Sequence, residues 1–236
     1  MSSPVQTAQS IRRHYSPPLG IVAIVYMVLF CAGLYPVTMF GGMPYYPGPW
    51  EPIQTITAFF QARPNAVLLC TFLQFGSAIP LGIFTASAVS RLRFLGVKAA
   101  GADIALFGGF ATAISMMIGS SLLWTMTRPD ISHNPVAVEA LYYVGFGIGG
   151  PGFSVPLGLL IAGLSVPALF MRLTPRWIPI CGLVIAAIGE LSWLNIMFPA
   201  ALPLIPLTRF PGFLWLIAYG FALPTTPARR SAEGPQ

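Results

Sequence analysis

Charged side chains are scarce in this sequence, and their scarcity excludes a water-soluble globule. Only 8% of the 236 residues are charged, whereas 56% are hydrophobic. A soluble domain carries about 25% charged residues, so this chain has too little polar surface to cover itself in water. Because about 20 apolar residues form one span, the length predicts an all-α, polytopic transmembrane bundle of about six helices.

Cysteine is also scarce, and this argues against a disulfide framework or a cysteine-based metal site. Cys31, Cys70 and Cys181 each fall inside an apolar run, and none is paired at a metal-ligand spacing. We expect all three to be small buried apolar residues. No pattern in the sequence indicates a cofactor or a metal.

The apolar runs divide the chain into one bundle and two tails. The tails are residues 1–17 and 224–236, and the second is predicted to be disordered. Residues 18–223 form the single bundle, and its longest connection is the loop 41–64. The predicted spans are residues 18–40, 65–90, 101–126, 136–171, 177–198 and 207–223.

Basic residues predict which ends of the spans face the cytoplasm, because lysine and arginine in short loops stay on that side. Three arginines, Arg63, Arg128 and Arg209, belong to the opposite side. Nine basic residues gather on one side, namely Arg12, Arg13, Arg91, Arg93, Lys98, Arg172, Arg176, Arg229 and Arg230. We therefore expect both termini to be cytoplasmic and the protein to lie in a bacterial cytoplasmic (inner) membrane.

The same charge distribution decides which partners to expect. A net charge of +6 suggests nucleic acid in a soluble protein, but here the basic residues occupy loops, so no nucleic acid is expected. The bilayer is the predicted partner. A stripe of small residues, Gly101, Ala105, Gly109 and Ala113, predicts a close helix contact. Its neighbour is expected in the same chain, with a second copy or a membrane partner protein left open.

The external loop 41–64 combines proline with aromatic residues. Its first half is too rich in proline for a regular helix. Residues 53–62 place Ile53, Ile56, Phe59 and Phe60 on one face. This pattern predicts a short amphipathic helix lying on the outer leaflet.

The fourth run is too long for one straight span. Its 36 residues would reach about 54 Å, against a hydrocarbon core of about 30 Å. We expect a break within residues 145–152, formed by Gly145, Gly147, Gly149, Gly150, Pro151 and Gly152. The break is either a packed kink, which we favour, or an unwound stretch that lines a cavity, as in secondary transporters.

Three polar residues are candidates for a ligand or proton site. Glu190 lies well inside the fifth span, where a carboxylate is costly and often functional. Gln74 lies at a similar depth in the second span, and we expect the two to pair. Glu139 begins the segment that leads to the glycine-rich break. For Glu190 and Gln74 the alternative use is a structural hydrogen bond between helices, and for Glu139 a solvated position in the loop.

The last span carries a pattern seen in other membrane proteins. The stretch Pro211-Gly-Phe-Leu-Trp-Leu-Ile-Ala-Tyr-Gly220 resembles the closing W-L-x-x-x-G pattern of a family of uncharacterised six-helix bacterial membrane proteins, a domain of unknown function. The resemblance covers most of residues 18–223. It implies the same six-helix fold, and it assigns no role to any residue.

Three functions fit these features. A small transport or permeation protein for small solutes, or for ions or protons, would use Glu190, Gln74 and the break to line a cavity. A non-catalytic membrane subunit or scaffold would bind a partner protein or lipid. An intramembrane enzyme acting on an apolar substrate is the least favoured, because Glu190 has no second acid, histidine or metal set at its depth.

The predicted topology can be checked with a tag placed after Gln236. In intact cells, a protease added outside should leave this tag uncut, because the C-terminus is expected in the cytoplasm. Disruption of the membrane should make the same tag cleavable. Cleavage of the tag in intact cells would contradict the orientation.

Overall fold

The computed structural model describes residues 13–227, and this part of the chain is helical with no strand. The predicted all-α bundle of six spans is therefore confirmed. Residues 228–236 of the predicted disordered tail lie outside the described residues. The α-helices are α1 (Leu19–Leu34), α2 (Ile53–Ala62), α3 (Pro64–Phe94), α4 (Gly101–Met126), α5 (Pro129–Ser132), α6 (Pro135–Gly149), α7 (Pro151–Phe170), α8 (Trp177–Leu191) and α9 (Leu204–Ala222).

Six helical segments are long and apolar enough to cross a membrane, and the chain is a multi-pass membrane protein. Large apolar side chains are exposed around the outside of the bundle, for example Phe72, Phe107 and Leu214. In water such a surface would be unfavourable, whereas hydrocarbon tails cover it without cost. The segments are Leu19–Val37, Pro64–Phe94, Gly101–Met126, Pro135–Phe170, Trp177–Ile196 and Pro199–Ala222.

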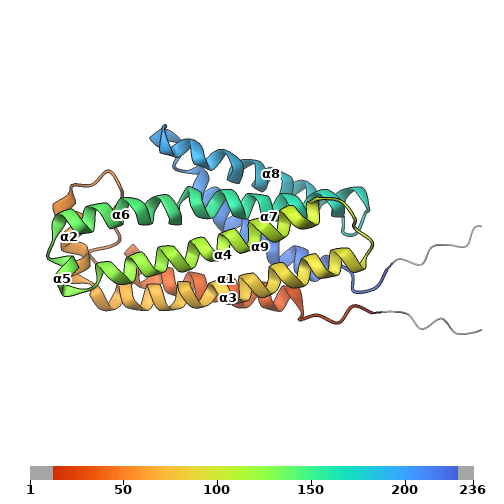
Figure 1. Cartoon of the computed structure of the whole chain (residues 1–236), viewed down its shortest axis with the longest axis horizontal. Helices are drawn as coiled ribbons and strands as arrows, with labels where there is room; N and C mark the ends of the chain where they lie inside the picture. The colour runs from red at the N-terminus through yellow and green to blue at the C-terminus, as the bar shows by residue number, and fades with distance from the viewer. Residues whose placement is uncertain (1–12, 228–236) are drawn as a thin grey trace, which may run out of the picture.

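The two ends of the bundle differ (Figure 1). Both ends of the described chain lie at one of them, where the backbone N–H of His14 donates to the carbonyl of Thr225 at 2.9 Å. We call this the terminal end. The opposite end carries α2, α5 and the 42–52 loop, and we call it the loop end.

Some helix limits differ from the predicted spans. The first span leaves the α-helix at Leu34 and continues as short 3-10 turns, η1 (Tyr35–Val37) and η2 (Met39–Gly41), because Pro36 interrupts the hydrogen-bonding pattern. The fifth span ends as η3 (Ser192–Ile196). After η4 (Pro199–Ala201), the last helix begins at Leu204, three residues earlier than predicted.

The long fourth span is broken as predicted. Helix α6 ends at Gly149 and α7 begins at Pro151, while Gly150 between them has φ −88° and ψ −102°, outside the helical region. The two helices continue in nearly the same direction (Figure 1). The predicted break at the glycine and proline cluster is therefore present.

Helices α4 and α7 approach closely at the centre of the bundle. A methyl group added at Gly163 would lie 2.5 Å from the backbone nitrogen of Ala105 and from the carbonyl oxygen of Gly101. One added at Gly108 would lie 2.4 Å from the nitrogen of Leu160. Gly101 and Ala105 of the predicted stripe thus pack against the backbone of α7, while Gly109 of the stripe faces the side chain of Thr85 on α3, so both neighbours belong to the same chain, as expected.

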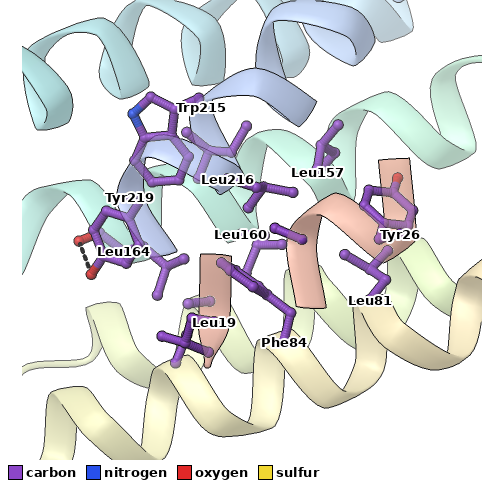
Figure 2. Packing of buried hydrophobic residues seen from close by; sticks show 14 of the residues in the cluster. Leu19, Tyr26, Leu81, Phe84, Leu157, Leu160, Leu164, Trp215, Leu216 and Tyr219 are labelled. Atoms are coloured by element: carbon purple, nitrogen blue, oxygen red, sulfur yellow. Dashed lines mark hydrogen bonds between the residues drawn. The ribbon is translucent and has the colours of Figure 1, made fainter. Parts of the chain in front are cut away.

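The terminal half of the bundle has a continuous apolar core (Figure 2). Within this core, the hydroxyl of Tyr219 donates a hydrogen bond to the carbonyl of Leu164 at 3.4 Å. The ring of Tyr219 stacks on Trp215. The core draws on α1, α3, α7 and α9, and includes Leu19, Tyr26, Leu81, Phe84, Leu157, Leu160, Leu164 and Leu216.

The loop end has a second, smaller core. Helix α2 forms over residues 53–62 as predicted, but its apolar face is buried in the protein rather than in the outer leaflet. Ile56, Phe59 and Phe60 pack with Val138 and Tyr142. The amphipathic pattern was correct, but it identifies only a face that must be buried, not the partner that buries it.

The cysteine prediction holds for one of the three residues. Cys70 is buried in the loop-end core, whereas Cys31 and Cys181 are exposed on the outside of the bundle. An apolar run in a membrane helix has a lipid-facing side as well as an interior side, so the run alone does not bury a residue in protein.

The α4–α7 contact can be tested by adding one methyl group. Gly163→Ala should lower the free energy of unfolding by about 1–3 kcal/mol, because the methyl group would overlap backbone atoms that cannot move aside. Gly82→Ala is the matched control, since its added methyl would meet only Phe110, at 3.8 Å. Reversible unfolding in mixed detergent measures both, and equal stabilities for the two variants would contradict the close contact.

Candidate functional site

A cavity of about 560 Å³ lies in the loop-end half of the bundle. Its walls come from α1, α3, α4, the α6–α7 break and the start of α9. Most side chains that line it are apolar, among them Leu34, Val37, Leu123 and Phe146. We call it the loop-end cavity.

The direction of each helix shows which lining residues lie deepest. Helices α1 and α4 run toward the loop end, while α3, α7 and α9 run away from it. The lining residue nearest the terminal end on each helix therefore belongs to the floor. These floor residues are Phe30, Gln74, Ser115, Phe153 and Arg209.

Among residues 13–227, Arg209 is the only charged side chain that lines the cavity. It lies in the second turn of α9, about 20 Å along the helix from Ala222. Its guanidinium carbon sits 4.5 Å from the ring centre of Phe153 and 5.5 Å from that of Phe30. Cations are attracted to aromatic faces at these distances, so the two rings hold the guanidinium at the floor.

The helix break supplies the hydrogen-bond acceptor for Arg209. The N–H of Phe153 donates to the carbonyl of Gly150 rather than to that of Gly149. The Gly149 carbonyl accepts a hydrogen bond from the Arg209 Nη2 instead. Nearby, the Ser115 hydroxyl donates to the carbonyl of Gly152 at 2.7 Å. Side chains of α4 and α9 thus satisfy backbone groups around the break, which lines the cavity through Gly145, Gly149 and Gly150.

The charge of Arg209 has no acidic partner among residues 13–227. The one ion pair in this part of the chain joins Arg93 to Asp103, near the terminal end. The Nε of Arg209 is buried and has no hydrogen-bond partner there. A cation in the hydrocarbon region is costly and usually paired, so Arg209 stands out as the functional candidate of the cavity.

Of the three side chains predicted from sequence, one lines the cavity. Gln74 is on the floor, and its neighbours Cys70, Thr71, Ser77 and Ala78 are buried, which agrees with the predicted interior face. Glu139 is exposed near the start of α6 and is not a lining residue. The break residues Gly145, Gly149 and Gly150 line the cavity, while Gly147, Pro151 and Gly152 stand beside it.

Glu190 lies elsewhere and does not pair with Gln74. Its Oε1 is buried against Gly158 of α7, and that oxygen has no hydrogen-bond partner among the described residues. Helices α8 and α3 lie on opposite sides of the bundle (Figure 1). The predicted pairing is therefore wrong, because equal depth in two spans does not place two residues on facing helix surfaces.

Sequence reasoning missed Arg209 as a site residue. It was counted with the external charges, although it lies in the second turn of α9 between apolar residues. The signal was available, since an arginine inside an apolar helical run differs from an arginine beside one. No protein-family model, curated protein or solved structure matches the chain.

The position of Glu190 yields a prediction for its neutral analogue. Glu190→Gln keeps the shape of the side chain and removes the cost of an unpaired buried carboxylate. The variant should therefore accumulate in the membrane and unfold with a free energy equal to or above that of the wild-type protein. A loss of more than about 1 kcal/mol, the size of one net hydrogen bond, would show that the acid makes an essential contact.

Proposed function

We propose that this protein is a small transport or permeation protein that takes an apolar molecule into the loop-end cavity. The observation that carries this proposal is the cavity itself. Its volume of about 560 Å³ lies within the range of about 300–1,000 Å³ found for small-molecule sites. The apolar lining suits a membrane-soluble substrate better than a hydrated ion.

The helix break supports transport. In secondary transporters, binding sites form where a broken helix exposes backbone groups to a cavity near the middle of the membrane. The break after Gly149 occupies such a position, and its backbone is held by Arg209 and Ser115. Between the cavity and the terminal end, the core around Leu160, Leu164 and Leu216 is packed. In this proposal, the structure is a state open toward the loop end and closed toward the terminal end.

The loop end is proposed to face the outside of a bacterial inner membrane. Counting Arg209 with the interior of the bundle strengthens the charge asymmetry, because among the described basic residues Arg63 and Arg128 alone then remain near the loop end. The described basic residues near the terminal end are Arg13, Arg91, Arg93, Lys98, Arg172 and Arg176. Short basic loops favour the cytoplasm, so the substrate would enter from outside.

The structure supports the two other functions, an intramembrane enzyme and a scaffold, less well. An enzyme that uses Glu190 as a general acid needs this residue beside the substrate, and Glu190 does not line the cavity. A scaffold needs a surface fitted to a partner protein, and the exposed apolar side chains lie around a bundle that lipid would cover. Neither arrangement explains why a cavity forms at the helix break.

Filling the cavity tests the proposal. Gly119 lines the cavity, and a methyl group added there meets no atom within 4 Å. Gly119→Phe should therefore fold normally but occupy the site. Binding of the neutral apolar fluorophore N-phenyl-naphthylamine to protein in nanodiscs should weaken by about tenfold or more, a loss of about 1.4 kcal/mol, because the phenyl ring takes volume that the fluorophore needs.

Gly76→Phe is the matched control. Gly76 also has open space around it, but it does not line the cavity. This variant should bind the fluorophore as the wild-type protein does, with empty nanodiscs giving the background. If the wild-type protein shows no binding above that background, or if both variants bind equally well, the proposed function fails.

A further inference from the structure

We propose that the ligand of the loop-end cavity is a hydrophobic organic anion, a molecule with one anionic oxygen group and an apolar body, and that Arg209 is its counter-charge. This inference rests on the proposed function, since it needs the cavity to be a binding site. It adds the charge of the ligand and the residue that recognises it.

The first argument is charge balance. Arg209 lies on the floor of the cavity, and none of the described residues that line it is acidic. The nearest compensation is the Gly149 carbonyl, a dipole rather than a charge. Helix α9 does not help, because Arg209 is close to its N-terminus, where the helix dipole is itself positive. A bound anion would complete a pair that residues 13–227 leave open.

The second argument is the orientation of the guanidinium. Phe153 and Phe30 take up its aromatic contacts, and Gly149 accepts from one of its nitrogens. The N–H groups of a guanidinium lie in its plane, at the edge left between such contacts, and they fit carboxylate or phosphate oxygens. The Nη1 of Arg209 forms no hydrogen bond within residues 13–227 and, unlike the Nε, is not closed off by protein atoms, so Nη1 is the donor that such an oxygen would satisfy.

The third argument is the rest of the lining. Two neutral polar side chains, Gln74 and Ser115, stand with Arg209 on the floor. Ser115 already donates to the Gly152 carbonyl, whereas no hydrogen bond of the Gln74 side chain is formed within the described residues. Its amide can donate to a second oxygen of the anion. From the floor to Val37 and Leu123 the walls are mostly apolar, with Ser120 and Tyr46 as their polar side chains, which suits a hydrocarbon body better than a small hydrated anion.

The wild-type protein provides the first test. Dansyl-labelled undecanoic acid and its methyl ester have the same body and differ in charge. In nanodiscs, at a mildly alkaline pH that ionises the acid, the acid should bind roughly ten- to a hundredfold more tightly than the ester, as expected for a hydrogen bond to a charged group. Equal binding, or tighter binding of the ester, would overturn the inference.

Unlabelled competitors identify the anionic group. Decanoate and decyl phosphate should displace the bound acid, and the more effective of the two shows whether the site prefers a carboxylate or a phosphate. Decanol should compete weakly. Inorganic phosphate, which has no apolar body, should not compete, and displacement by inorganic phosphate at concentrations similar to those of decyl phosphate would overturn the inference.

Variants assign the preference to Arg209. Arg209→Gln keeps a donor for the Gly149 carbonyl but removes the charge, so it should abolish the preference for the acid while ester binding persists. Arg209→Lys keeps the charge and should restore part of the preference. Arg128→Gln removes a charge near the same end of the bundle, outside the cavity, and should change nothing. A preference that survives in Arg209→Gln would overturn the assignment.

The two proposals fail in different ways. If neither the acid nor the ester binds to the wild-type protein, the proposed function itself is wrong. If the neutral ester binds, and Gly119→Phe blocks it, but the acid has no advantage, the cavity is a binding site and only the inference about its ligand is wrong.

Discussion

The close approach of α4 and α7 is the contact on which the rest of this bundle depends. Gly108 on α4 lies against Leu160, and Gly163 on α7 lies against Gly101 and Ala105, so closely that neither glycine has room for a side chain. In lipid, where the hydrophobic effect does not drive helices together, such dispersion contacts are a main source of association. With these two helices fixed at the centre, α3 packs on α4, and α8 packs on α7. The contact therefore sets the positions of the helices around it.

The cavity follows from the limits of that contact. Toward the terminal end, large side chains fill the space between the helices, with Leu160 and Phe84 in the centre. Toward the loop end, α7 gives way to α6 at Gly150, and glycines replace the side chains that would fill the interior. The break also leaves the Gly149 carbonyl without its helical partner, and Arg209 takes that place. A break in the helical hydrogen bonding, an empty volume and a buried cation thus arise from one short segment.

The sequence predicted the number, order and approximate limits of the spans, because the apolar runs and their glycine and proline boundaries carry that information. It also placed the break in the fourth span, since length alone required one. It could not give the rotation of each helix about its own axis. Gln74 and Glu190 were matched by depth, but α8 packs on α7 and α9, so the two residues face different neighbours. Arg209, at the start of the predicted span 207–223, was counted with the charges of the outer side, because counting charges by side does not distinguish a residue at a helix boundary from one a turn inside it. Three residues, Leu204 to Pro206, made that difference by extending α9.

The two ends of the described chain are joined by side-chain and backbone contacts. His14 donates to Thr225, and the buried guanidinium of Arg91 donates to the Leu223 carbonyl at 3.2 Å and to the Ser16 hydroxyl at 2.7 Å. Because these two ends lie close together, the order of the helices along the chain could be changed without changing how the helices pack. A circularly permuted protein, joined here by a short linker and opened at another connection, would retain every interhelical contact described above. The contacts between neighbouring helices thus determine the architecture, and more than one order of helices along the chain is compatible with them.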